Sequence, residues 1–293
     1  ALEELDRART QPPARRTLPF VPAAPERGRA GVPAFTLSFR RWEQLTPDCL
    51  DQGPALVYLP CQELPGHEDA LRRWAQAYPD IGFGVVLPRV VWDRELPRLR
   101  RELEAARQAG VTQALLGHIG QLPLARSFGL IPRGDFGLGL TNDETAAELA
   151  RLGFASATAS FESRLAQIRD LSKPLDLELL VYGRLPLMLM EHCILRNRGQ
   201  GCHCQDKPQS LGDRKGEHFP VESAWGCRNE LFNAKPLWLA DKTDWRTAGA
   251  AYARLAFLRE GPGECARVFR AYREGAGEPP RAFTRGLYYR GVE

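Results

Sequence analysis

The stretch Phe35-Thr-Leu-Ser-Phe39 is the first of several short apolar runs that decide the fold of this chain. Apolar runs of about five residues, bounded by polar and turn-forming residues, are typical of buried β-strands. The sequence predicts seven of them: Phe35–Phe39, Ala55–Leu59, Phe83–Leu87, Gln113–Leu116, Phe136–Leu140, Ser156–Phe161 and Leu177–Val181. Pro236–Ala240 is a candidate eighth strand, and this number of strands favours a barrel over an open sheet.

Helical patterns separate most of these strands. They cover Trp42–Cys49, Glu68–Tyr78, Glu95–Ala109, Glu144–Leu152 and Ser163–Leu171. Strand, helix and strand, repeated with short links, predict a parallel sheet. We expect Asn142 to cap the helix after it, and Gly110 and Gly153 to end theirs. The fold class is therefore α/β, with a (β/α) barrel-like core that is either complete or incomplete.

The remaining segments divide around this core. Residues 1–33 carry six Pro and several Arg, which is typical of an extended linker, and Ala1–Arg9 matches the end of a helix. Residues 34–181 are the barrel-like domain, and residues 182–245 are a Cys-rich metal or cluster module. Residues 246–293 are a helical C-terminal cap with a basic aromatic tail, and the helical patterns there are Trp245–Arg259 and Glu264–Glu274.

The composition is that of an ordinary globular protein, with 43% hydrophobic and 26% charged residues in 293. It excludes low-complexity disorder and collagen, and no apolar stretch is long enough to span a membrane. Without a leader pattern after Ala1, we expect a cytoplasmic protein that is part of a longer chain. Only five of the 40 basic residues are Lys, which indicates either a GC-rich genome or phosphate recognition by Arg.

The seven Cys residues are unevenly distributed. Four of them, Cys193, Cys202, Cys204 and Cys227, lie close together in the sequence. An odd number of Cys in a large chain fits poorly with a secreted disulfide scaffold, whereas clustered thiolates bind zinc or an iron–sulfur cluster. The spacing does not choose between these metals, and unrelated buried thiols remain the alternative. Either Cys202 or Cys204 could be an additional thiol that binds no metal, and His192 and His203 are possible ligands in its place.

Specific motifs surround the cysteines. They are Tyr182-Gly-Arg-Leu-Pro-Leu-Met-Leu-Met-Glu-His-Cys193, Asp213-Arg-Lys-Gly-Glu-His-Phe-Pro220 and Cys227-Arg-Asn-Glu-Leu-Phe-Asn-Ala-Lys-Pro-Leu-Trp-Leu-Ala-Asp241. Upstream motifs are Gly117-His-Ile-Gly-Gln-Leu-Pro-Leu-Ala125, Gly134-Asp-Phe-Gly-Leu-Gly-Leu-Thr-Asn142 and Ser160-Phe-Glu-Ser163. This pattern resembles the collagenase-like peptidase family, peptidase family U thirty-two, closely over residues 115–293 and loosely over 34–114. The chain looks like the C-terminal part of a long member.

The resemblance implies more than proteolysis. Members of this family include oxygen-independent hydroxylation factors that act on ribosomal RNA, on tRNA or on ubiquinone precursors. Several hold a 4Fe–4S cluster on four Cys, and those that modify RNA are linked to prephenate. Cys193, Cys202 or Cys204, and Cys227 match the Cys-bearing motifs, and Gly117–Ala125 and Gly134–Asn142 look like barrel strands of the family.

Further candidate site residues follow from position. Arg214, Lys215 and Arg228 lie among or beside the predicted ligands, and with Asn142 they are candidates for binding an anionic substrate. Asp213, Glu217 and Glu230 could instead neutralise these cations internally. The candidate catalytic residues lie at strand ends or in the turn near the cysteines: Glu162, Tyr182, Asp213 and His118. The tail from Arg285 to Arg290 could bind RNA or dock onto the barrel.

Several functions can be compared on this basis. We expect an enzyme, an iron–sulfur-dependent and oxygen-independent modification factor that acts on an RNA base, with RNA and a longer parent chain or a paired family member as partners. A collagenase-like peptidase is the alternative, but no serine elbow or zinc-protease helix is present. A non-enzymatic zinc-stabilised binding module is the second alternative. Gly134-Asp-Phe-Gly137 precedes its predicted strand, so it fails as a dinucleotide-binding loop.

Overall fold

Eight parallel strands close into a barrel in the computed structural model, which describes residues 1–12, 15–19, 21–22, 31–194, 196 and 208–291. The barrel strands are β1 (Ala34–Ser38), β2 (Leu56–Pro60), β3 (Gly82–Val86), β4 (Gln113–Leu116), β5 (Ile131–Gly134), β6 (Ser156–Thr158), β7 (Asp176–Gly183) and β13 (Tyr252–Ala256). Each pairs in parallel with its neighbours, and β13 joins β7 to β1. The barrel-like core expected from the sequence is therefore confirmed, and it is closed.

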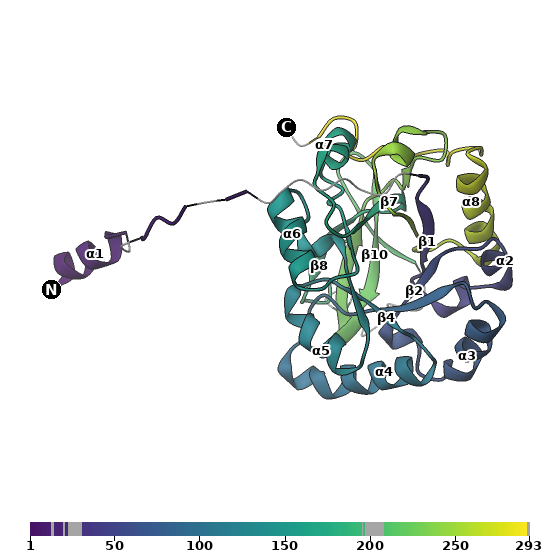
Figure 1. Ribbon diagram of the computed structural model, residues 1–293, viewed down its shortest axis with the longest axis horizontal. Coiled ribbons are helices and arrows are strands. Elements are labelled where there is room, and N and C mark those ends of the chain that lie inside the picture. The colour runs from purple at the N-terminus through teal and green to yellow at the C-terminus, as the bar shows by residue number, and fades with distance from the viewer. Residues whose placement is uncertain (13–14, 20, 23–30, 195, 197–207, 292–293) are drawn as a thin grey trace.

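Helices surround the strands (Figure 1). They are α2 (Pro47–Leu50), α3 (Glu68–Ala77), α4 (Leu96–Gln108), α5 (Leu122–Ser127), α6 (Asp143–Arg151), α7 (Leu165–Asp170) and α8 (Pro262–Glu274). Asn142 caps α6 by accepting a hydrogen bond from the Thr145 backbone N–H at 2.9 Å. Gly110 and Gly153 follow α4 and α6 with positive φ angles, so both predicted helix ends are confirmed. None of the described helices is long and apolar enough to cross a bilayer.

Two strand predictions near the middle of the chain are wrong. The strand expected at Phe136–Leu140 is a short 3-10 helix, η5 (Phe136–Leu138), because the Asp135 side chain accepts a hydrogen bond from the Phe136 N–H and turns the chain. The actual strand, β5, precedes it and places Asp135 at its carboxyl end. Gly117–Ala125 also forms no strand, since it contains η4 (Ile119–Gln121) and most of α5.

The C-terminal elements also differ from expectation. The predicted helix at Trp245–Arg259 is wrong, because Tyr252–Ala256 is the eighth barrel strand, paired on both sides. Side chains of a strand alternate between its two faces, but the apolar residues around 252–256 also fit the spacing of a helix, so the sequence did not distinguish the two. The candidate eighth strand at Pro236–Ala240 contains only β12 (Leu237–Trp238), which runs antiparallel to β7 outside the barrel. The second predicted C-terminal helix is present as α8.

A second sheet is inserted between β7 and β13. It is antiparallel, in the order β8-β11-β10-β9, and is here called the lid sheet. Its strands are β8 (Pro186–Met190), β9 (Gln209–Gly212), β10 (His218–Ala224) and β11 (Arg228–Phe232). Gly183 starts the connection with a φ of 122°, and a Cβ there would lie 2.1 Å from the Ala256 carbonyl oxygen, so only glycine fits.

Polar side chains fill the middle of the barrel. Arg254 on β13 is 4% exposed and donates to Glu178 on β7 (Nε to Oε2, 2.9 Å) and to Asp135 (Nη1 to Oδ1, 2.7 Å). Glu178 also accepts from the hydroxyls of Thr36 and Thr158, at 2.5 and 3.1 Å. Burial acts to lower the pKa of Arg254, but the two carboxylates raise it above its usual value. The barrel is therefore crossed by a hydrogen-bonded ion network where such barrels usually pack branched apolar residues.

The N-terminal helix α1 (Leu2–Thr10) confirms the helix expected at Ala1–Arg9. It has no buried residue and lies apart from the barrel (Figure 1). Of the described residues between α1 and β1, only Pro33 is buried.

Replacing Arg254 should destabilise the barrel more than replacing any exposed arginine does. Arg254→Met leaves Glu178 without its main counter-charge, and a broken buried pair costs about 3–5 kcal/mol of unfolding free energy. Adding Glu178→Met should recover part of this loss, because the uncompensated charge is then removed. Urea unfolding measures both effects. Arg270→Met, on the exposed face of α8, is the control, and equal midpoints for Arg254→Met and this control would contradict the assignment.

Candidate functional site

A cavity of about 180 Å³ lies between the carboxyl ends of the barrel strands and the lid sheet. The barrel contributes residues that end or follow its strands, among them Ser38, Pro60, Leu87 and Asp135. The lid sheet contributes Leu189, Trp225, Arg228, Glu230 and Phe232. The carboxyl end is where β/α barrels place their active sites, so this cavity is the candidate site.

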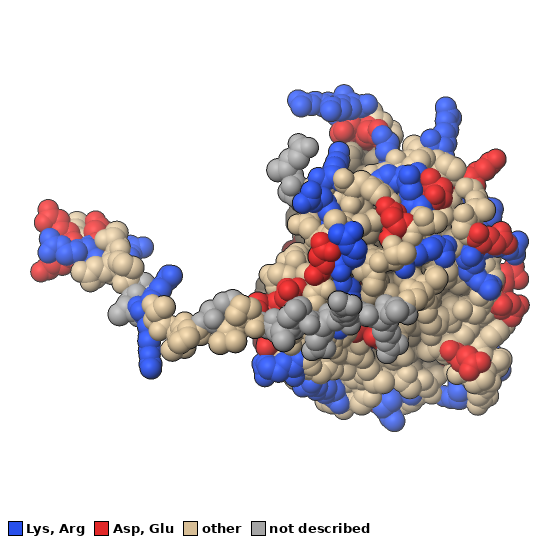
Figure 2. Space-filling model, turned by 45° about the horizontal axis from the view of Figure 1, so that its top comes forward, with Lys and Arg blue, Asp and Glu red and all other residues tan. Residues whose placement is uncertain are grey.

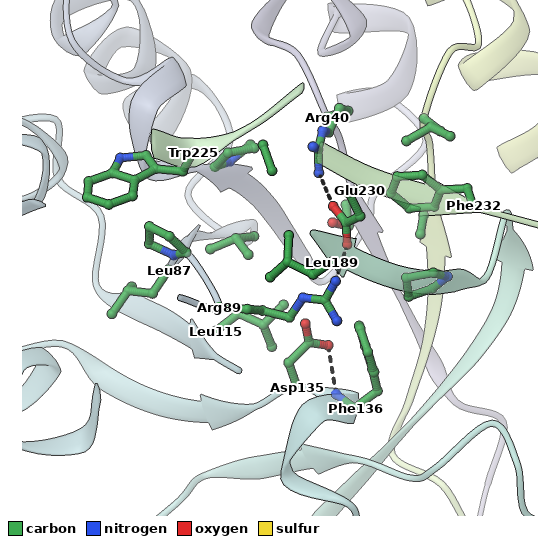
Figure 3. Close-up of a pocket in the computed structure, with 18 of the residues that line it drawn as sticks. Arg40, Leu87, Arg89, Leu115, Asp135, Phe136, Leu189, Trp225, Glu230 and Phe232 are labelled. Atoms are coloured by element: carbon green, nitrogen blue, oxygen red, sulfur yellow. Dashed lines mark hydrogen bonds and ion pairs between the residues drawn. The ribbon is translucent and has the colours of Figure 1, made fainter. Parts of the chain in front are cut away.

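One wall of the cavity is cationic. Arg40, after β1, donates to Glu230 Oε2 at 2.9 Å, and Arg89, after β3, donates to Glu230 Oε1 at 2.5 Å (Figure 3). The Arg40 guanidinium lies 5.8 Å from the ring centroid of Phe232, and that of Arg89 lies 5.2 Å from the centroid of Phe136. Two guanidinium groups thus share one carboxylate, which leaves a positive charge for a ligand to neutralise.

Two further arginines line the cavity. Arg184 donates to the backbone carbonyls of Asn233 and Ala234, and burial lowers its pKa. Arg254 lies at the floor, where Asp135 and Glu178 neutralise it. The walls between these charges are apolar and aromatic, formed largely by Phe39, Leu87, Phe136, Leu189, Trp225 and Phe257.

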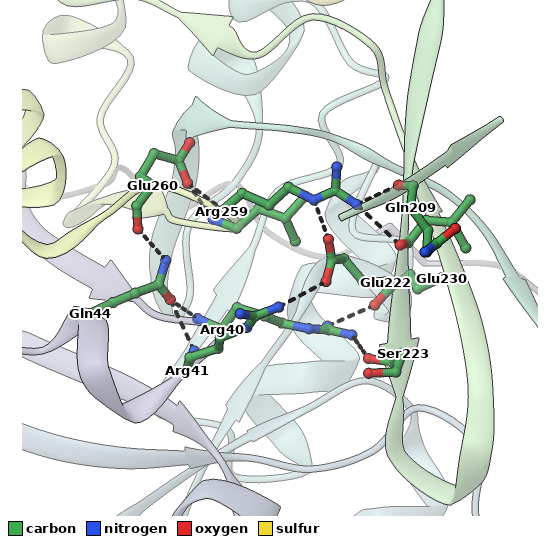
Figure 4. A network of polar contacts seen from close by, with 11 residues as sticks. Arg40, Arg41, Gln44, Gln209, Glu222, Ser223, Glu230, Arg259 and Glu260 are labelled. Atoms are coloured by element: carbon green, nitrogen blue, oxygen red, sulfur yellow. Dashed lines mark hydrogen bonds and ion pairs between the residues drawn. The ribbon is translucent and has the colours of Figure 1, made fainter. Parts of the chain in front are cut away.

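Charged contacts fasten the lid sheet to the barrel (Figure 4). Arg40 also donates to the Ser223 carbonyl at 2.7 Å, and Arg259, after β13, pairs with Glu222. Arg41 lies 3.6 Å from the same Glu222 carboxylate. Since these arginines belong to barrel loops and their acceptors to β10 and β11, ion pairs between the two parts hold the lid sheet over the cavity.

A buried carboxylate on α4 anchors the other side of the lid. Glu102 is 6% exposed and accepts hydrogen bonds from Trp225 Nε1 at 2.7 Å and from the Cys61 thiol at 3.0 Å. Burial, reinforced by Glu102, raises the pKa of Cys61, so this group remains a thiol and donates. Arg98 pairs with Glu102 and stacks over the Trp225 ring at 4.8 Å.

The segment 225–228 carries one predicted metal ligand. Cys227 is exposed and has a φ of 62°, which is uncommon and unfavourable for a residue with a side chain. The half-buried Cys193 follows β8, and the register pairs Met190 with Asn229, so both thiols lie beyond the same end of the β8–β11 ladder. Asn229 ties the two segments together by accepting from the Ile194 N–H at 2.8 Å.

Arg228, a predicted substrate-binding residue, lines the cavity but is already neutralised. It is 1% exposed and pairs with Glu191 at 2.5 Å and with Glu95 at 3.0 Å. Hydrogen bonds from Arg228 and Trp92 lower the pKa of Glu191. Partial burial acts to raise the pKa of Glu95, but hydrogen bonds from Arg228 and the Trp92 N–H lower it overall. Neutralisation of Arg228 by acidic residues of the same chain was the expected alternative. The expected acids were Asp213, Glu217 and Glu230, whereas the structure shows Glu95 and Glu191.

The remaining predicted substrate-binding residues lie elsewhere. Arg214 and Lys215 are exposed in the β9–β10 turn, where Asp213 accepts hydrogen bonds from the N–H groups of Lys215 and Glu217. Asn142 caps α6. None of these residues lines the cavity.

The catalytic candidates are also outside the cavity. Glu162 and His118 are exposed in the loops after β6 and β4. Partial burial of the imidazole lowers the pKa of His118. Tyr182 is buried among aromatic rings and donates to Glu260 Oε1 at 2.9 Å. Burial first, and then Glu260, raise the pKa of Tyr182, so the phenol stays protonated. Asp213 holds the exposed turn.

The C-terminal tail docks onto the barrel, which was one of its two expected roles. Tyr288 is buried and donates to the Leu180 carbonyl at 2.7 Å, and Arg285 pairs with Asp241 at 2.5 Å. Tyr289 is 44% exposed and donates to Asp244 at 2.8 Å.

Sequence reasoning missed the charged residues of the cavity. Arg40 and Arg89 follow correctly predicted strands, so a search for polar residues just beyond strand ends would have found them. Asp135 was hidden because the predicted strand began after it. Arg254 was hidden because its strand was assigned to a helix. Glu230 was expected to neutralise Arg214, Lys215 and Arg228, but its partners are Arg40 and Arg89, because the lid sheet folds over the barrel.

Comparisons of the sequence with protein-family models and with curated proteins give no match. Solved structures of similar shape include the U32 peptidase Mk0906, at 13% identity and a TM-score of 0.46, covering 82% of this chain and 98% of that one. A mutant tryptophan synthase α-subunit from Pyrococcus furiosus matches at 9% identity and a TM-score of 0.47, covering 83% and 99%. A 3-hexulose-6-phosphate synthase matches at 12% and 0.43, covering 83% and 100%.

The U32 peptidase belongs to the family that the sequence motifs resemble. At these sequence identities the matched structures show similarity of fold, and their activities are not assigned to this chain.

Removing the Arg228 side chain should loosen the segment that carries Cys227. Arg228→Ala leaves the Glu95 and Glu191 carboxylates without their shared partner, so amides of residues 225–232 should exchange hydrogen at least about tenfold faster, while barrel strands keep their rates. Hydrogen–deuterium exchange with mass spectrometry measures this. Arg94→Ala, which removes a neighbouring arginine stacked on Trp92, is the control. Unchanged exchange in β11 would show that Arg228 does not hold the loop.

Proposed function

We propose that this protein is an oxygen-independent hydroxylation or modification factor that acts on an RNA base and uses a cluster held by cysteines. One observation carries the proposal: Cys193 and Cys227 flank one end of the β8–β11 ladder, and Trp225 and Arg228, on either side of Cys227, line the cavity at the barrel mouth. A redox-active group at this edge of the lid sheet would lie next to the substrate. The motif resemblance supports the same reading.

The available thiols fit a metal or cluster site in part. Cys193 is half-buried and Cys227 exposed, and both lie beyond the same end of the antiparallel β8–β11 ladder. Cys202 and Cys204, the other predicted ligands, lie outside the described residues. No group of three or more ligand-type side chains occurs among the residues that are described. We propose a 4Fe–4S cluster on these thiols, with zinc as the alternative, and the cluster would supply electron transfer.

The cavity suits a small ring. A cavity of about 150 Å³ can hold a benzene-sized molecule, and this one is about 180 Å³. Phe136, Leu189 and Trp225 offer apolar surfaces for the faces of a ring, while Arg40 and Arg89 offer N–H donors. These residues would bind and orient an unstacked base and exclude water from it. A prephenate co-substrate, proposed from the resemblance, would place its carboxylates against the same cationic wall.

The outer surface adds little to RNA binding on the face that Figure 2 presents. Positive and negative side chains are interspersed there, without a large field of one sign. The RNA proposal therefore depends on the cavity, and a partner protein or the rest of a longer chain would supply further contacts with the RNA backbone. The peptidase alternative finds no support in the cavity, because none of the described histidines lines it.

The cysteines should divide into ligands and bystanders. Cys193→Ser and Cys227→Ser should lose most of the bound iron or zinc, because a hydroxyl is a poor ligand for soft metals. Cys49→Ser and Cys265→Ser should retain it, since both thiols are buried at α2 and α8, away from the lid. Metal analysis and absorption near ~400 nm after anaerobic purification distinguish a cluster from colourless zinc. Of Cys202→Ser and Cys204→Ser, the variant that loses metal identifies the ligand. Equal metal content in all variants would end the metal proposal.

Deletion of the parent gene should remove one modification from cellular RNA. The wild-type gene should restore it, and Cys227→Ser or Arg89→Ala should not, because one loses a ligand and the other a base-facing donor. Mass spectrometry of RNA digests measures the modification, with Arg270→Ala as the control. RNA binding should also weaken as salt rises. An unchanged RNA profile together with gelatin cleavage above a Cys193→Ser background would favour the peptidase.

A further inference from the structure

The carboxylate of Asp135 uses only one of its oxygens within the fold. Oδ1 accepts from the Phe136 N–H at 2.9 Å and from Arg254 Nη1 at 2.7 Å. The contacts described for Asp135 do not involve Oδ2. The residue is 7% exposed, and the surface that it retains faces the cavity. A carboxylate held in this way offers a fixed acceptor at the cavity floor.

The surrounding residues hold this carboxylate in place. Arg254 is permanently protonated and is itself fixed by Glu178 on the neighbouring strand. Oδ1 is fixed by the backbone of η5, so the side chain cannot rotate without losing two hydrogen bonds. An acceptor that is positioned before a ligand arrives loses little entropy on binding.

Arg40 and Arg89 supply the complementary chemistry in the same cavity. Arg40 and Arg89 approach Glu230 from the two sides of its carboxylate, and Arg89 also stacks on Phe136, the residue after Asp135 (Figure 3). The cavity therefore presents a free acceptor at Asp135 and donors at Arg40 and Arg89, with apolar side chains such as Leu189 and Trp225 lining the rest of it. A ligand with one sign of charge at both ends would meet repulsion at one of them.

We infer that Asp135 is a ligand-binding residue, which accepts a hydrogen bond from an N–H or O–H on one edge of a small ring while Arg40 and Arg89 bind a carboxylate or carbonyl on the other edge. The inference rests on the proposed function only in taking this cavity as the substrate site. It narrows the ligand to a planar or ring-shaped molecule that carries a donor edge and an acidic or acceptor edge.

Three probes separate the two edges in the wild-type protein. Orotate has ring N–H donors and a carboxylate; 1,3-dimethylorotate keeps the carboxylate but has no ring N–H; benzoate has a ring and a carboxylate alone. Isothermal titration calorimetry should show orotate binding at least about tenfold more tightly than either of the others, because only orotate can donate to a charged acceptor. Equal affinities, or no binding of orotate, would overturn the inference without any variant.

A variant then assigns the effect to Asp135. Asp135→Asn preserves the Oδ1 contacts and presents a donor in place of the free acceptor, so it should remove the preference for orotate and leave benzoate within about twofold. Arg89→Gln should weaken the binding of both orotate and benzoate. Glu148→Gln, which like Asp135→Asn replaces a carboxylate by an amide but on the exposed face of α6, should weaken the binding of neither. A preference that survives Asp135→Asn would overturn the assignment. An intact preference in a protein that modifies no RNA would refute the proposed function and leave this inference standing.

Discussion

The buried ion pair between Arg254 and Glu178 is the interaction on which the arrangement of the barrel and its cavity depends. It joins β13 to β7 inside the barrel, and Thr158 and Asp135 extend it to β6 and to the end of β5. Buried charges cost desolvation free energy, so each must find its partners when the barrel closes. Breaking one pair of this network leaves an uncompensated buried charge, so the pairs must form together. Gly84 on β3 makes room beside it, since a Cβ there would lie 2.8 Å from the Tyr58 ring.

This network also connects the core with the site. Arg254 and Asp135 belong both to the barrel interior and to the cavity floor, so the acceptor that faces the cavity is fixed by the same contacts that close the barrel. The lid sheet has a different basis. Its contacts with the barrel are largely ion pairs from loops, and Glu230 and Glu222 each meet arginines from more than one loop. A rigid floor and a lid held by charges suit a site that must admit and then enclose a substrate.

Predictability from the sequence differed between strands for physical reasons. Phe83–Leu87 and its neighbours were recognised because a buried parallel strand is apolar on both faces. Ile131–Gly134 contains Pro132, Arg133 and Gly134, and its polar inward residue concealed it. Tyr252–Ala256 has Arg254 at its centre, which fits a helical pattern as well as a strand. Arg254 thus lies on one missed strand and Asp135 directly follows the other, whereas Glu178 lies on a strand that was predicted.

The sequence by itself determined the α/β alternation, the helix caps at Asn142 and Gly110, and the grouping of four cysteines in one segment, because these features are written in neighbouring residues. Only the tertiary structure decided which strand closes the barrel and which charges meet. Arg254 and Asp135 are 119 residues apart, and Arg40 and Glu230 are 190 apart. No local pattern encodes such pairs, since each side chain is compatible with solvent until closure removes the water and leaves one partner within reach.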